Sequence, residues 1–215
     1  MSLKTVIGST FAAISMLGMV TTAYAENWHT DFDGPFELVN GAGETVTEKD
    51  LLGHKSLIYF GYTQCLMQCP PTWITIDQVV SRLQSEGIDI RAYFVSIDPD
   101  RDTVETVAAW QENWPNITGL TGSREQVHDV AEVFHIFFAR KPMHAMSFAM
   151  KDMMRVKNKF GADERVDWDR EKPQDYYMMD HTFTTFLLDE NGRYVTHFEV
   201  EEDAETIYDY IRKPM

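Results

Sequence analysis

Apolar residues form two patterns along the chain: short continuous runs, and runs with a three-to-four-residue spacing. Continuous runs such as 57–62 are typical of strands buried on both faces of a sheet. Apolar residues spaced three or four apart, as in 70–86, predict helices that bury one side. The expected strands are 57–62, 88–98, 135–139, 183–189 and 193–200, and the expected helices are 70–86, 102–114, 123–134 and 203–212.

Residues that favour turns and helix ends mark the limits of these elements. The segment 40–43, Asn-Gly-Ala-Gly, separates two short apolar runs and predicts an N-terminal hairpin. Ser123 and Gln126 have the spacing of a capping box, and Asp102 is the expected N-cap of its helix. Strands that alternate with helices and end in a hairpin predict an α/β protein. Its central sheet has flanking helices, in an order that suits a thioredoxin-like fold.

Length and charge limit the classes of function. The chain has 215 residues, 44% of them hydrophobic, which is enough for one packed domain. Its formal net charge of −15 repels phosphate backbones and attracts cations and basic protein surfaces, so no nucleic-acid partner is expected. There are only two cysteines, Cys65 and Cys69, too few for a disulfide scaffold, so any role of the pair is local.

The first residues have the pattern of an export signal. Lys4 precedes a short apolar stretch, and Ala23-Tyr24-Ala25 is a small-x-small cleavage pattern, so residues 1–25 are interpreted as a secretory signal peptide. The alternative is an uncleaved membrane anchor, but the apolar stretch is shorter than the ~20 residues that span a bilayer. The mature domain, 26–215, is then periplasmic or otherwise exported, with no permanent membrane span.

The two cysteines lie between a predicted buried strand and a predicted helix. Pro70 disfavours helical geometry at Cys69, so the helix is expected to begin near Pro70. The positive end of the helix dipole favours thiolates at this place. Two thiolates in one loop can bind a soft metal ion or form a disulfide, and an inert buried pair is the remaining alternative.

A metal ion held by two thiolates needs a further ligand, and histidine is the usual one. His181 stands out among the seven histidines because it follows a long segment, 140–176, and directly precedes a buried strand. In a thioredoxin-like sheet, this connection runs close to the cysteine loop. Asp180 either orients the imidazole from behind or is a solvated loop acid.

Four segments together resemble the Sco/SenC family of copper-binding proteins. They are GYTQCLMQCPPTW (61–73), SIDPDRDT (96–103), LTGSREQ (120–126) and DHTFTTFLLDENG (180–192). The resemblance implies a thioredoxin-like fold and one copper ion, Cu(I) or Cu(II), bound by Cys65, Cys69 and His181. It further implies delivery of copper to the binuclear copper site of cytochrome c oxidase, or preparation of the thiols of that site.

Two functions compete at this site. A copper metallochaperone, which is not an enzyme, would exchange copper with a cytochrome c oxidase subunit and with other copper carriers. A thiol–disulfide oxidoreductase would instead use Cys65 and Cys69 as catalytic residues on the cysteines of that partner, together with thiol reductants. The chain has CxxxC rather than CxxC, and His181-Thr182 where thioredoxin-type reductants place a proline. These departures favour the metal-binding function.

The segment 140–176 is rich in methionine. Thioethers bind Cu(I), so Met143, Met146 and Met150, together with His144, are candidates for an accessory copper site. The alternative is that these methionines form one apolar stripe of a helix.

Overall fold

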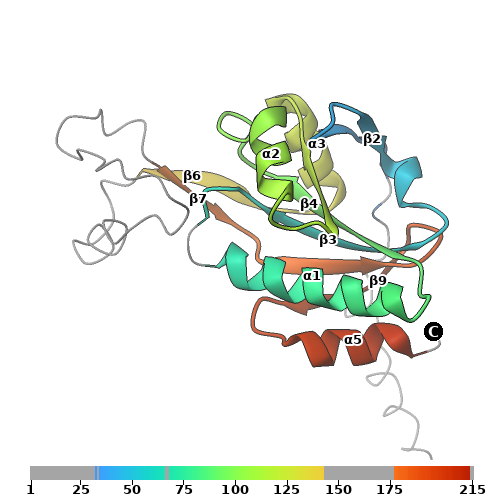
Figure 1. The fold of residues 1–215 in the computed structure, drawn as a ribbon. Coiled ribbons are helices and arrows are strands. Elements are labelled where there is room, and N and C mark those ends of the chain that lie inside the picture. The colour runs from blue at the N-terminus through green and yellow to red at the C-terminus, as the bar shows by residue number, and fades with distance from the viewer. Residues whose placement is uncertain (1–31, 33, 66–67, 143–176, 214–215) are drawn as a thin grey trace, which may run out of the picture. The chain divides into compact units, whose positions relative to one another are not determined.

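The computed structural model describes residues 32, 34–65, 68–142 and 177–213. Seven strands form one sheet in the order β2-β1-β5-β4-β3-β8-β9 (Figure 1). They are β1 (Glu37–Asn40), β2 (Thr45–Thr47), β3 (Lys55–Gly61), β4 (Ile90–Ser96), β5 (Ile117–Thr121), β8 (Thr184–Leu188) and β9 (Tyr194–Glu199). A separate antiparallel pair consists of β6 (Phe138–Pro142) and β7 (Tyr177–His181). The helices are the 3₁₀ turn η1 (Glu48–Leu51), α1 (Cys69–Ser85), α2 (Val104–Gln111), α3 (Arg124–Val133) and α5 (Ala204–Arg212).

The centre of the sheet is parallel and buried on both faces, as the continuous apolar runs predict. β3 and β5 flank β4 in parallel, while β8 joins β3 antiparallel. Tyr59 and Phe94 are paired across β3 and β4, so their side chains lie on the same face. There Phe94 packs against Trp73 of α1 and Trp110 of α2.

The opposite face of the sheet is covered around the end of α3. Phe134, the C-cap residue of α3, packs against Phe60 of β3 and Phe186 of β8. These two rings alternate with the residues that face α1, as expected for strands with a two-residue period. The sheet is therefore a central layer with helices on both faces, which confirms the predicted α/β class.

Three expectations about single elements differ from the structure. The expected strand 135–139 begins only at Phe138, because His135 has a φ of 54° in the left-handed region at the end of α3. Asp102 is not a helix cap. The N-cap of α2 is Thr103, whose hydroxyl accepts a hydrogen bond from the backbone N–H of Thr106. Strand β5 was not expected at all, since it is short and contains Gly119.

Several expectations fall outside the described residues. These include the proposed signal peptide, 1–25, and most of the expected insertion 140–176, since β6 ends at Pro142 and β7 begins at Tyr177. The candidate accessory residues, Met143, His144, Met146 and Met150, lie there too. Among the helices of the described part, none combines the length and apolar character needed to cross a bilayer.

Candidate metal centre

The two cysteines occupy the end of the loop after β3 and the first turn of α1. The backbone N–H of Cys65 donates to the carbonyl of Tyr62 at 3.1 Å, which bends the chain back after the strand. α1 begins near Pro70 as predicted, but Cys69 is itself the first helical residue, although a following proline disfavours that geometry. Its backbone N–H points at Cys65 and donates to the Sγ atom at 3.3 Å. Both cysteines are free thiols, and both are buried.

His181 reaches the same place from a distant part of the chain. It is the last residue of β7, and its Nε2 atom lies 4.0 Å from Sγ of Cys69, although the two residues are 112 positions apart. Its Nδ1–H donates to the carbonyl of Thr182 at 2.8 Å. Because a carbonyl can only accept, this bond places the proton on Nδ1 and leaves the lone pair of Nε2 facing the sulfur.

The separation of sulfur and nitrogen suits a single bridging ion. Metal–sulfur and metal–nitrogen bonds of about 2.3 and 2.0 Å, the values for zinc, together exceed the 4.0 Å between Sγ of Cys69 and Nε2 of His181. In the part of the chain that the structure describes, no three His, Cys, Asp or Glu side chains are already grouped as a metal site. At this place the structure has a sulfur–imidazole pair, Cys69 and His181, with the sulfur of Cys65 beside Cys69.

Aromatic side chains enclose these donor atoms. The hydroxyl of Tyr59 donates to Sγ of Cys69 at 3.4 Å, and the ring of Tyr62 meets the imidazole of His181 edge-on at 6.0 Å. Phe183 also packs against the imidazole, with ring centres 4.2 Å apart. Gly61 leaves room for the sulfur, because a Cβ atom there would lie 3.2 Å from Sγ of Cys69. The donor atoms thus lie in largely aromatic surroundings that pack against the sulfur and the imidazole.

The two thiols differ in charge. The hydrogen bond from Cys69 lowers the pKa of Cys65 to about 4, although burial acts in the opposite direction. Burial raises the pKa of Cys69, and its hydrogen bond to Cys65 raises it further. The pair therefore shares one proton, held on Cys69, with Cys65 as the thiolate.

The acidic segment after β4 has a larger part in the site than the sequence indicates. Asp102 is fully buried, and its carboxylate accepts hydrogen bonds from the backbone N–H and hydroxyl of Thr63 and from the hydroxyl of Ser96. Burial raises the pKa of Asp102, while these hydrogen bonds lower it. Thr63 lies two residues before Cys65, so Asp102 fixes the start of the cysteine loop. The signal in the sequence is the high density of acids in 98–102, which a simple turn does not need.

Asp180 lies beside the site without facing it in the structure. Its carboxylate is half-exposed and pairs with Nζ of Lys141 at 3.1 Å, across the β6–β7 pair. The partner of the imidazole Nδ1 is the carbonyl of Thr182. Orientation of His181 therefore comes from the backbone in this conformation.

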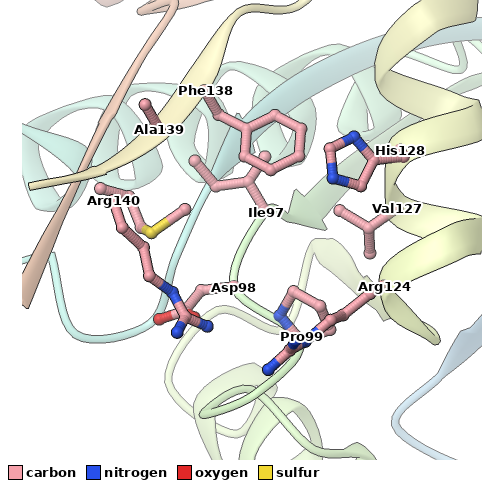
Figure 2. Close-up of a pocket in the computed structure, with 10 residues that line it drawn as sticks. Ile97, Asp98, Pro99, Arg124, Val127, His128, Phe138, Ala139 and Arg140 are labelled. Carbon is pink, nitrogen blue, oxygen red and sulfur yellow. The ribbon is translucent and has the colours of Figure 1, made fainter. Parts of the chain in front are cut away.

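A cavity of about 270 Å³ lies beside the β6–β7 pair (Figure 2). Its apolar wall includes Phe138, whose ring lies 4.9 Å from that of His128 on α3. Arg124 and Arg140 enter from opposite sides toward the loop that carries Asp98 and Pro99. This cavity is lined by different residues from those of the cysteine and histidine site.

Comparison with known proteins identifies relatives over most of the chain. The SCO1/SenC family model matches residues 25–156 and 149–215. A SCO2-like protein of Rickettsia prowazekii is 34% identical over 180 residues, which covers 83% of this chain and 75% of that protein.

Solved structures of Sco proteins share the fold. Arabidopsis thaliana ScoI with copper bound has a TM-score of 0.66 and 26% identity, covering 84% of this chain and 95% of that one. BsSco, described as a member of the Sco family of cytochrome c oxidase assembly proteins, has a TM-score of 0.57 at 21% identity, covering 86% and 93%. The expected thioredoxin-like fold is thereby confirmed.

Proposed function

This chain belongs to the SCO1/SenC family, and on that premise we propose that it is a copper metallochaperone. It binds one copper ion through Cys65, Cys69 and His181. It passes the ion to the thiolates of a copper-receiving protein such as a subunit of cytochrome c oxidase. Cytochrome c oxidase assembly is the role described for the Sco family with BsSco.

One observation carries this proposal. The lone pair of Nε2 on His181 faces Sγ of Cys69 at 4.0 Å, with Nδ1 held by a carbonyl. A histidine that served only packing would not need its free nitrogen directed at a thiol. This arrangement, in which an outer hydrogen bond fixes the tautomer of the ligating imidazole, is the usual one in metal sites.

The donor set fits copper in both oxidation states. Two soft thiolates suit Cu(I), and the added imidazole makes the site acceptable to Cu(II). A relative with the same fold, Arabidopsis ScoI, contains bound copper. Ligand exchange with a partner's thiolates then moves the ion without releasing it to solvent.

Copper titration of the reduced protein tests this assignment. We expect one tight site with thiolate-to-Cu(II) charge-transfer absorption, which is lost in Cys65→Ala and in Cys69→Ala. In His181→Ala, we expect Cu(II) binding to be lost and Cu(I) binding to remain. His197→Ala, which removes an imidazole on β9, is the matched control and should behave as wild type. If His181→Ala binds Cu(II) as tightly as wild type, the ligand assignment is wrong.

The charge asymmetry of the cysteines supports a second candidate, a thiol–disulfide oxidoreductase. The lowered pKa of Cys65 makes it the attacking thiolate, and the protonated Cys69 beside it would then resolve the mixed disulfide. The substrate disulfide is reduced to two thiols while Cys65 and Cys69 are oxidised to a disulfide. Rapid reduction of insulin disulfides by metal-free protein, abolished in Cys65→Ser, would favour this function over the first.

We place the site of action outside the cytoplasm, with residues 1–25 removed and the domain 26–215 as the mature form. The support is the Ala-x-Ala pattern before Glu26. Determination of the N-terminal residue of the protein purified from its native host tests this, and Glu26 is the expected first residue. An intact Met1 would contradict it.

A further inference from the structure

The strand that carries His181 is not part of the main sheet. Among the described strands, β6 and β7 pair with each other and with no other strand, so main-sheet hydrogen bonding does not fix their position. The imidazole must nevertheless be placed against Cys69 to within a few tenths of an ångström if it is to bind metal with the thiols. Side-chain contacts with the rest of the domain therefore add to the short link through which His181 is joined to β8.

Asp98 provides the most buried of these contacts. Its side chain is 1% exposed and accepts a hydrogen bond of 2.6 Å from the hydroxyl of Tyr177, the first residue of β7. Arg101 forms an ion pair with the same carboxylate and also donates to the carbonyl of Tyr177 at 3.0 Å. The guanidinium of Arg101 lies 3.8 Å from the centre of the Tyr177 ring. The buried carboxylate thus holds the start of β7 through one direct hydrogen bond and through Arg101, which makes two further contacts with Tyr177.

The neighbouring Asp100 holds the other strand of the pair. Its carboxylate forms ion pairs with Arg140 of β6 and with Arg124 of α3, the latter at 2.7 Å. Arg140 also lies 4.0 Å from Asp98 and over the ring of Tyr177. Figure 2 shows the side chain of Arg140 extending to Asp98 from β6, while Arg124 approaches Pro99 from α3.

The same short segment also contacts the cysteine loop. Arg101 donates to Oε1 of Gln64 at 3.3 Å, directly before Cys65. Asp102 accepts from the backbone N–H of Thr63 at 2.9 Å. The loop 98–102 is therefore in contact with both stretches that carry the candidate ligands.

We propose that Asp98, acting through Tyr177 and Arg101, is a positioning residue that sets the distance between the His181 imidazole and the two thiols. Asp98, Asp100, Arg101, Arg140 and Tyr177 are called the clamp from here on. The clamp determines whether copper is held by three ligands or by two. This inference rests on the proposed function only for the identity of the metal.

The consequence differs between the oxidation states of copper. Two thiolates are sufficient for Cu(I), whereas Cu(II) also requires the imidazole. Loosening the contacts of the clamp with Tyr177 displaces His181 and leaves the thiols in place, because Cys69 lies in α1 and Cys65 is held by its own hydrogen bond to the carbonyl of Tyr62. It therefore weakens Cu(II) binding selectively. Loss of a hydrogen bond to a charged group lowers Cu(II) affinity by about tenfold or more.

The test uses two variants of the full chain. Tyr177→Phe removes only the hydroxyl that Asp98 binds and keeps the ring between the two arginines. Asp98→Asn keeps the shape of the side chain and removes its charge. Lys141→Gln is the matched control, since it removes an ion pair on the same two strands that does not involve the clamp. Circular dichroism checks that each variant is folded.

The first measurement needs no copper. In metal-free, reduced protein labelled with ¹⁵N-histidine, wild type and Lys141→Gln should show His181 in one sharp state with Nδ1 protonated. Tyr177→Phe and Asp98→Asn should show broadened or doubled signals of His181. Signals of His181 in Tyr177→Phe and Asp98→Asn that match wild type would overturn the positioning role, whatever metal the protein binds.

The second measurement compares the two copper ions. Tyr177→Phe should lose about tenfold or more in Cu(II) affinity, while Cu(I) affinity changes by less than about threefold. Equal losses for both ions would contradict the clamp, because they would indicate displaced thiols. A wild-type protein that binds no copper would refute the proposed function instead, and the histidine signals would still decide the role of Asp98.

Discussion

Gly61 is the residue whose substitution tests the packing of the site most directly. It ends β3, and a Cβ atom built there would lie 3.0 Å from Cε1 of Tyr59 and 3.2 Å from both Sγ of Cys69 and Cε2 of Phe94. Non-bonded carbon contacts are most favourable at about 3.5–4.0 Å, so all three neighbours must shift in Gly61→Ala.

The size of the effect follows from these contacts. Overpacking of this kind costs ~1–3 kcal/mol of unfolding free energy. For a domain of this size, each kcal/mol lowers Tm by ~2–4 °C. Because Sγ of Cys69 is one of the displaced atoms, Gly61→Ala should also weaken copper binding by the folded protein.

Gly119→Ala is the control for a purely structural effect. A Cβ atom there would lie 2.5 Å from Cγ1 of Val107 and 3.3 Å from the ring of Trp110, and none of its close neighbours is a candidate ligand. Its Tm should fall at least as far as that of Gly61→Ala. The assays are thermal unfolding of the reduced, metal-free protein and competition for Cu(I) with a chromophoric chelator. Wild-type Cu(I) affinity in Gly61→Ala, or an equal loss in Gly119→Ala, would refute the reasoning.

Three further predictions concern single side chains. His54 is 2% exposed, and burial lowers the pKa of its imidazole in the folded protein. As pH falls, His54 is therefore protonated in the unfolded chain before it is protonated in the folded one. The contribution of neutral His54 to the free energy of unfolding is therefore complete above the ordinary pKa of about 6.5 and decreases as pH drops below it. Urea titrations at several pH values should show that the free energy of unfolding decreases less in His54→Gln than in wild type. Tyr59→Phe removes the hydrogen bond to Cys69, so the unfolding free energy should fall by about 0.5–1.5 kcal/mol and the Cu(II) charge-transfer band should move to longer wavelength. An unmoved band would mean that the bond is absent from the copper form. His135→Gly should raise Tm, since it relieves a left-handed residue that costs about 1–2 kcal/mol, and a lowered Tm would show that side-chain contacts of His135 matter more.

The elements that the sequence predicts well are those buried on both faces or capped by local side chains. The run 57–62 is unambiguous because a continuous apolar strand has few alternative structures, and the capping box of Ser123 and Gln126 is present as expected. β5 escaped prediction because five residues that include Gly119 carry little periodicity. His54 lies in a polar stretch, which gives no sign that the folded chain buries its imidazole.

In the candidate metal centre, too, local features could be predicted from the sequence and long-range contacts could not. The position of the two cysteines after a strand and before a helix is a local feature, so it could be predicted from spacing and from Pro70. The proximity of His181 to Cys69 is a long-range feature: its place before a buried strand made His181 a candidate, and the family resemblance was needed to assign it as a ligand. The role of Asp98 could not be predicted, because its partner Tyr177 is 79 positions away and the contact depends on how β7 is placed.

The ladder between β6 and β7 runs from Phe138 opposite His181 to Pro142 opposite Tyr177, so the last described residue of β6 and the first residue of β7 are direct neighbours. The far end of this paired stem is held by the contact of Tyr177 with Asp98, and the base carries the imidazole of His181. We expect that the sequence between Pro142 and Tyr177 can be lengthened, shortened or exchanged, in evolution or by design, as long as the strands and the contacts of Tyr177 are kept. The imidazole of His181 then keeps its position. The β6–β7 pair is therefore a suitable place to insert a binding module next to a metal-transfer site.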